Sequence, residues 1–184
     1  VAKTYFQFKP GPNTTIHTMD GRQYLKATRK KYDLILMDAY TSNPYGSFIP
    51  FHLATQEFFA LAKSRLKPGG MLAYNVIGQL SGWRKNILGS VFKTMETSFP
   101  TIYMFPASSS RNVVMVGDTG TQRYTRGLLM ESARALVNRG RAPMPGYVAM
   151  VGKVYDPDAR PAAYKASPIL TDAYAPVNGL LTGD

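Results

Sequence analysis

The chain has 184 residues, no cysteine and a formal net charge of +11, with 45% hydrophobic and 18% charged residues. This composition is that of one globular domain with a hydrophobic core, and it excludes wholesale disorder, a disulfide framework and a zinc–thiolate site. No apolar run approaches the ~20 residues that a membrane helix needs, so we expect a cytoplasmic protein without a membrane partner.

The first part of the chain predicts two strands, a helix and a loop. Residues 14–20 are expected to form a short strand that ends at Asp20, and residues 22–30 a helix after Gly21. The strongest strand signal is residues 32–38, where an unbroken apolar run, Leu34 to Met37, is typical of a strand covered on both sides. A loop broken by prolines follows as far as Pro50.

The second part predicts three helices and three strands. The last two strands are close enough to form an antiparallel hairpin at one edge of a sheet. Lys67-Pro68-Gly69-Gly70 is expected to stop the first of these helices. Beyond residue 142 the chain is rich in proline and glycine, so we divide it into a domain at 1–140 and an extension at 141–184 that packs on it. The expected helices span 53–66, 83–99 and 122–138, and the expected strands 71–77, 101–105 and 112–117.

Strands that alternate with helices predict an α/β protein with a largely parallel sheet. In such sheets ligands bind beyond the carboxyl ends of the strands, where Asp20 and Asp38 are both expected. A partly desolvated carboxylate at Asp38 suits a proton acceptor or a ligand for an ammonium group, and the alternative is a helix cap or a surface residue. Asp20-Gly21 suits the binding of an amine or hydroxyl, but Asp20 fits a plain helix N-cap equally well.

The remaining charged residues give weaker signals. Basic residues gather at Lys26 to Lys31 and at Arg134 to Arg141, where they either attract an anionic partner or complement helix ends, and the absence of a motif favours the second interpretation. Neither His17 nor His52 has a helix-spaced partner, so we expect structural histidines and no metal. Serines 108–110 lack the elbow motif of a hydrolase nucleophile.

Four motifs occur in register along the chain: DGRQYL at 20–25, YDLILMD at 32–38, TQEFF at 55–59 and LKPGG at 66–70. A fifth lies near the end, where Leu170 to Val177 reads LTDAYAPV. Together they resemble the spermidine synthase family of polyamine aminopropyltransferases, whose members close with Thr-Asp-Asp-x-Ala-Pro-Val. The resemblance covers about residues 1–120 and 168–178.

The resemblance implies a methyltransferase-type Rossmann-like fold and an aminopropyl transfer. It places Asp20 against the adenine amino group of decarboxylated S-adenosylmethionine, with Gly21 beside it, and it makes Asp38 the catalytic residue that orients the attacking amine and removes its proton. Tyr40 and Thr41 follow as substrate-binding residues. They depart from the family, which has Ser-Ser-Asp where this chain has Ala39-Tyr40-Thr41.

The resemblance also implies that the fold is partial in this chain. The family's first strands and its Gly-rich nucleotide loop would precede Val1, so we expect a longer protein, a homo-oligomer or a partner chain to complete the sheet. The remaining alternative is a rearranged sheet with no nucleotide site. A diamine such as putrescine is the expected acceptor. Nucleic acid is a further possible partner, but no sequence motif supports it. The alternatives are a catalytically degenerate binding or assembly subunit and a methyltransferase that uses S-adenosylmethionine itself.

Overall fold

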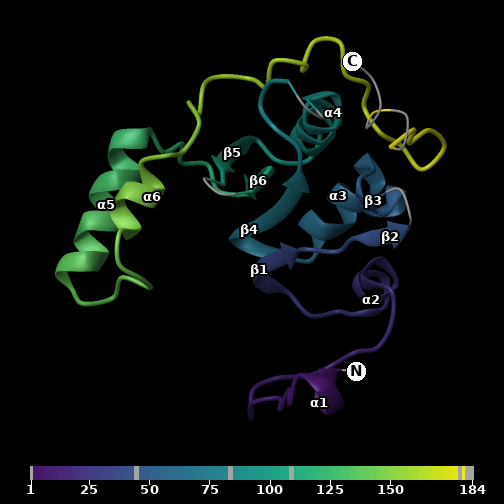
Figure 1. The fold of residues 1–184 in the computed structure, drawn as a ribbon, viewed down its shortest axis with the longest axis horizontal. Coiled ribbons are helices and arrows are strands. Elements are labelled where there is room, and N and C mark those ends of the chain that lie inside the picture. The colour runs from purple at the N-terminus through teal and green to yellow at the C-terminus, as the bar shows by residue number, and fades with distance from the viewer. Residues whose placement is uncertain (1, 44–45, 83–84, 108–109, 178–179, 181–184) are drawn as a thin grey trace.

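A four-stranded mixed sheet forms the centre of the computed structural model, which describes residues 2–43, 46–82, 85–107, 110–177 and 180 (Figure 1). The strand order is β1-β4-β6-β5, with β1 parallel to β4 and the other neighbours antiparallel. The predicted hairpin at one edge is therefore confirmed, but the prediction of a largely parallel sheet is wrong for the described strands. Only one of the three strand pairs in this sheet is parallel, because β6 runs antiparallel to both of its neighbours. The strands are β1 (Tyr32–Met37), β4 (Leu66–Ile77), β5 (Thr101–Pro106) and β6 (Asn112–Asp118), and a separate pair is formed by β2 (Thr41–Asn43) and β3 (Gly46–Phe48).

Helices α3 and α5 begin later than the periodicity suggests, because threonine side chains cap them. Thr55 Oγ1 accepts a hydrogen bond from the Phe58 amide, and Thr125 Oγ1 accepts one from the Leu128 amide. Leu66 to Gly70, expected to end a helix, belong to β4 instead. The helices are α1 (Ala2–Tyr5), α2 (Gly21–Ala27), the 3₁₀ turn η1 (Phe51–Leu53), α3 (Gln56–Ser64), α4 (Lys85–Glu96), α5 (Arg126–Asn138) and α6 (Tyr147–Val151).

One face of the sheet carries the hydrophobic core. Alternate residues of β4, namely Leu72, Tyr74 and Val76, are fully buried beneath α3 and α4. The C-terminal segment, residues 156–177, completes this core through Leu170 and Val177. Leu170 is tied in on both sides, because its carbonyl accepts from the Gln56 amide at 2.8 Å and its amide donates to Thr94 Oγ1 at 2.9 Å.

The opposite face of the sheet is open beside β1, which corrects the prediction of a strand covered on both sides. Leu34 and Leu36 are 52% and 70% exposed, while Met37 on the other face is buried. Among the described residues β1 pairs with β4 alone, so its outer edge has no neighbour. An apolar run shows that both faces are suited to burial, and here only one of them is buried.

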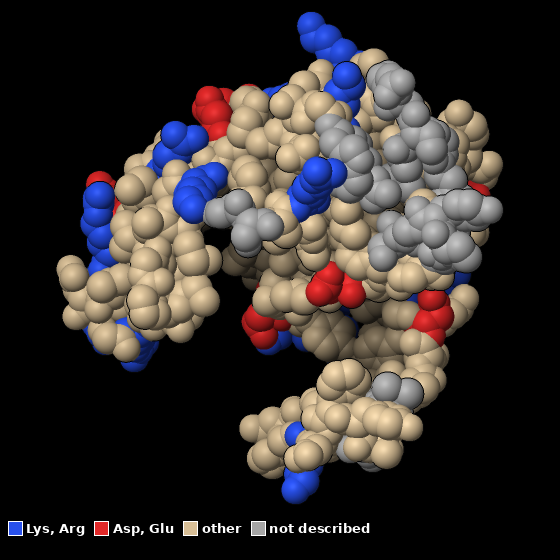
Figure 2. Space-filling view, viewed as in Figure 1, with Lys and Arg blue, Asp and Glu red and all other residues tan. Residues whose placement is uncertain are grey.

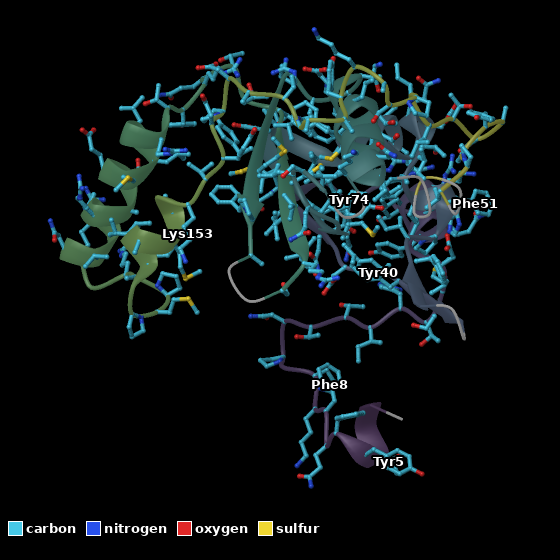
Figure 3. The ribbon with its side chains drawn as sticks, turned by 45° about the horizontal axis from the view of Figure 1, so that its top comes forward. Tyr5, Phe8, Tyr40, Phe51, Tyr74 and Lys153 are labelled. Atoms are coloured by element: carbon cyan, nitrogen blue, oxygen red, sulfur yellow. The ribbon has the colours of Figure 1, made fainter. Side chains whose placement is uncertain are left out.

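The prediction of a strand at residues 14–20 is also wrong. The segment is extended but pairs with no described strand, and its side chains are exposed. A strand needs a neighbour for its N–H and C=O groups, and the chain here runs away from the sheet (Figures 1 and 3), with Tyr5 and Phe8 far from Tyr74 in the core. Asp20 consequently caps a helix and does not end a strand.

Helices α5 and α6 lie beyond the β5–β6 side of the sheet and pack against each other (Figure 1). No helix among the described residues has the length and apolar character needed to cross a membrane.

Candidate functional site

Asp38 follows β1 at its carboxyl end and belongs to a short chain of polar side chains on the open face of the sheet. Asn75 Nδ2 donates to Asp38 Oδ1 at 2.9 Å, and Asn112 Nδ2 donates to Asn75 Oδ1 at 2.9 Å. The second bond fixes which way the Asn75 amide points, so its N–H group faces the carboxylate. Asp38 itself is exposed, which corrects the expected partial desolvation: no described residue covers this face.

Tyr40 is hydrogen-bonded to Asn75, the residue that donates to Asp38. Its hydroxyl donates to the backbone carbonyl of Asn75, and its ring is half-buried (Figure 3). Burial, together with the negative charge of Asp38, raises the pKa of Tyr40 to about 12. Tyr40 is therefore a neutral hydrogen-bond donor at physiological pH, and it holds Asn75 beneath Asp38.

Asp20 has partners within the chain for both of its carboxylate oxygens. Oδ1 accepts from the Gln23 amide at 2.9 Å as the N-cap of α2, and Oδ2 lies 2.8 Å from Nε2 of His52. The bond from the Gln23 amide, with that from His52, lowers the pKa of Asp20 below its usual value. Asp20 thus serves as the helix cap that the sequence allowed, and each oxygen retains a lone pair for a ligand.

Three of the five predicted site residues line two separate cavities, and Asp38 also lines a third cavity, of about 320 Å³, together with Asn75 and Asn112. Gly21 and Asp38 line one cavity of about 480 Å³ beside β1, although they come from different elements. A side chain added at Gly21 would meet nothing within 4 Å, so the backbone there is open to a ligand. Thr41 and His52 line another cavity, of about 430 Å³, under the C-terminal segment. Thr41 is therefore not brought to either cavity that Asp38 lines.

An ion pair ties the start of α2 to the C-terminal segment. Arg22 Nη2 lies 2.6 Å from Asp172 Oδ2, and Arg22 Nη1 donates to the carbonyl of His52 at 2.9 Å. Thr55 Oγ1 donates to Asp172 Oδ1 at 2.7 Å. Residues of the DGRQYL, TQEFF and LTDAYAPV motifs therefore meet in one network, which lies next to Asp20 and the cavity lined by Thr41.

The structure also shows where the first basic cluster lies and which of the expected residues fall outside the described part of the chain. Lys26 lies in the last turn of α2, and the other cations of the first cluster lie just beyond it. No group of three or more His, Asp or Glu side chains suited to a metal occurs in the part of the chain that the structure describes. Ser108 and Ser109, like the start of the helix expected at residue 83, lie outside the described residues.

Asn75 and Asn112 were missed by the sequence analysis, as was the pairing of Arg22 with Asp172. The available signal was an asparagine within the apolar strand 71–77, because a polar side chain inside such a run requires a partner. The signal for Arg22 was an arginine at the start of a helix that otherwise has apolar residues turned inward.

Comparison with known proteins decides the family. The spermine/spermidine synthase domain matches residues 3–109, which is more than half of the chain. The chain belongs to this family. A polyamine aminopropyltransferase of Vibrio vulnificus is 42% identical over 78 residues, and a probable polyamine aminopropyl transferase of Bifidobacterium longum is 28% identical over 183 residues. These matches cover 41% and 90% of this chain, but only 25% and 37% of the two relatives. The chain therefore spans between a quarter and two fifths of the length of these relatives.

Solved structures agree on the fold. Human methyltransferase-like protein 13, crystallised with SAH, superposes with a TM-score of 0.64 at 25% identity, over 78% of this chain and 66% of that one. A probable spermidine synthase from Corynebacterium glutamicum gives the same TM-score at 17% identity, over 93% and 58% of the two chains. The predicted α/β, methyltransferase-type Rossmann-like fold, partial in this chain, is confirmed.

Proposed function

We propose that this chain carries the amine-binding side of an aminopropyltransferase, which transfers an aminopropyl group from decarboxylated S-adenosylmethionine to a diamine such as putrescine. The observation that carries the proposal is the carboxylate of Asp38 at the carboxyl end of β1, held by Asn75 and lining one cavity with Gly21. Membership of the spermine/spermidine synthase family supports this reaction class.

For this reaction the protein has to place the two substrates next to each other and remove a proton from the attacking amine. The amine nitrogen forms a bond to the propyl carbon, the carbon–sulfur bond breaks, and the sulfonium becomes a neutral thioether. The proton lost by the amine passes to Asp38 as general base. The same carboxylate attracts the ammonium form of the substrate, because opposite charges favour each other in a cleft. The bond from Asn75 leaves Asp38 Oδ2 for the amine.

The nucleotide would lie on the Gly21 side of the cavity. We assign Asp20 to the adenine amino group and Gly21 to close backbone approach, with Tyr40 beside Asp38 and Thr41 at the neighbouring cavity as substrate contacts. The cavity beside β1 is open in this chain. We therefore also propose that a further segment, or a second copy, lies along β1 and completes the binding site.

Release of methylthioadenosine from decarboxylated S-adenosylmethionine and putrescine by the native protein tests the reaction. Asp38→Asn keeps the shape of the side chain but removes the proton acceptor. We expect kcat to fall by about 10²–10⁴-fold, the usual contribution of a general base, while the melting temperature stays unchanged.

Asp33→Asn is the matched control. Asp33 lies on the same strand, is exposed, and forms an ion pair with Lys67 at the surface, so loss of its charge should leave kcat unchanged. Equal turnover by the Asp38→Asn variant and the wild type would refute the assignment of Asp38, and absence of methylthioadenosine release by the native protein would refute the proposed reaction.

A methyltransferase is the second candidate, and the similarity to human methyltransferase-like protein 13 favours it. The two functions can be distinguished by offering the protein two differently labelled group donors. S-adenosylmethionine labelled in its methyl group marks the acceptor only in a methyltransferase, whereas decarboxylated S-adenosylmethionine labelled in its propyl group marks it only in an aminopropyltransferase.

A further inference from the structure

Helices α5 and α6, with the loop between them, form an arm at residues 122–155 that is fixed to the body at both ends. The Tyr124 amide donates to the hydroxyl of Tyr103 at 2.7 Å, and the Tyr155 amide donates to the carbonyl of Met104 at 2.8 Å. Arg126 Nη2 closes the base of the arm on the carbonyl of Val154 at 2.8 Å. The arm is therefore a braced hairpin of helices, on the far side of the sheet from β1 (Figure 1).

An apolar groove of about 840 Å³ runs between the two helices of the arm. Several of its walls are exposed: Val137 is 43% and Met144 48% exposed. Within the arm only Ala133 is buried on α5, so the helices bury little of their apolar surface in each other. The groove is lined by Met130, Val137, Ala142, Pro143, Met144, Pro145, Gly146, Tyr147, Val148 and Ala149.

The rim of this groove is positively charged. Residues 122–154 contain six basic residues and one acidic residue, Glu131. Arg134 lies on the helix face of Met130 and Val137, since these positions are spaced by four and three residues. Arg139 and Arg141 flank the turn where the groove begins, and all three arginines are exposed and have no ion pair with a described residue. In Figure 2 Lys and Arg line the outer edge of the arm beside a broad uncharged surface.

We propose that the arm docks an acidic amphipathic helix of a partner protein. An apolar groove receives the apolar face of such a helix, and methionine side chains adapt to it. The unpaired arginines at the rim match acidic side chains on its flanks and give the association its charge selectivity. The apolar residues line a groove between two helices, and a groove favours a helix that inserts side chains over a flat membrane surface or a nucleic acid backbone.

The partner is unidentified, so the probe is a displayed library of helical peptides of about 16 residues, roughly four turns, selected on the whole 184-residue chain. We expect enriched sequences that combine Glu or Asp with Leu, Phe or Met at helical spacing. Fluorescence anisotropy with one enriched peptide then measures the dissociation constant for three variants. Arg139→Glu/Arg141→Glu reverses the rim, Met144→Lys places a charge in the groove, and Arg29→Glu/Lys30→Glu makes the same charge change in the other basic cluster.

The first two variants should each weaken binding by about tenfold or more, and the third should not change it. Raising the salt concentration from about 50 to about 300 mM should weaken binding to the wild type, because salt screens the attraction, but should not weaken binding to the rim-reversed variant. Circular dichroism confirms that each variant is folded. The proposal is overturned if selection enriches no acidic amphipathic sequences, or if the enriched peptide binds the rim-reversed variant as tightly as the wild type. It is equally overturned if anionic vesicles or duplex RNA bind the arm, through Arg139 and Arg141, more tightly than any peptide.

Discussion

Arg22 is a cation held almost entirely inside the protein, since its side chain is 10% exposed. Burying a guanidinium is costly unless its donors are hydrogen-bonded. Here Nη1 and Nη2 donate to Asp172 and the His52 carbonyl, while the buried Nε has no partner among the described residues. The Arg22 guanidinium, with a smaller contribution from Thr55, lowers the pKa of Asp172 below its usual value. The C-terminal segment is thus fastened electrostatically as well as by the burial of Leu170.

The first prediction concerns the pH dependence of this pair. Because the pKa of Asp172 is lower in the folded than in the unfolded state, the pair stabilises the fold fully above the unfolded value of about 3.9 and is lost as pH falls through the folded value. Asp172→Asn should cost about 1–2 kcal/mol at pH 7, a reduced figure because Asp172 is half-exposed and partly screened. Urea unfolding from pH 7 to pH 3 should show this difference shrinking as the wild type loses the pair.

Asp158→Asn is the control for the pair. Asp158 meets Arg123 at 2.9 Å, but both side chains are well exposed, so the expected loss is below about 0.5 kcal/mol. A difference for Asp172→Asn that stayed constant down to pH 3 would show that ionisation of Asp172 contributes nothing to stability.

At the scale of single residues, the sequence was informative where a local pattern decides the position. Asp38 could be placed at a strand end because the apolar run before it is local. The partners of Asp38 could not be predicted, since Asn75 and Asn112 reach it only through the register of β4 against β1 and β6. Arg22 and Asp172 are 150 residues apart, and no spacing rule connects them.

At the scale of elements, α4 lies against the C-terminal segment at a point where only glycine fits. A Cβ atom on Gly89 would clash with Ser167 Oγ and would lie 3.0 Å from the backbone of Ala163. Lys93, one turn further along the helix, donates to the Ser167 carbonyl at 2.9 Å. The close approach of helix and segment therefore depends on the missing Cβ atom.

The second prediction follows from this contact. Gly89→Ala should destabilise the protein by about 1–3 kcal/mol, as expected for overpacking, although alanine usually favours a helix. Gly127→Ala in α5 is the matched variant, because its added Cβ would meet only Thr125 Oγ1, at 3.7 Å, and it should be neutral or stabilising by up to about 1 kcal/mol. Thermal unfolding distinguishes the two. Equal melting temperatures for both variants would contradict the packing argument.

The sequence predicted a helix or strand correctly where its formation does not depend on pairing with a segment far away in the chain. The hairpin of β5 and β6 has both strands close in the chain, and the prediction was right. Residues 14–20 have the composition of a strand, but strand pairing belongs to two segments and not to one. Helix starts moved because threonine caps, not apolar periodicity, decide where a helix begins.

At the scale of the whole molecule, the sheet is asymmetric. One face and the β5 side are covered, while the outer edge of β1 and the face that carries Leu34, Leu36 and the Asp38 cluster are open among the described residues. An exposed strand edge beside large apolar side chains is a template for pairing with another chain. The 184-residue chain should therefore associate with a second copy along β1, unless another segment already lies there.

The third prediction tests that association. In sedimentation velocity the 184-residue chain should form dimers or larger species, and Leu36→Lys should shift it towards monomer, because a charge beside the open edge opposes pairing. Leu128→Lys is the control, since Leu128 is 43% exposed on α5, away from β1, and it should leave association unchanged. If Leu128→Lys dissociates the species and Leu36→Lys does not, the contact lies on the arm and the β1 edge is not the interface. If the wild type is monomeric at every concentration tested, the open edge is tolerated in solution, and the site beside Asp38 is accessible without displacement of a second chain.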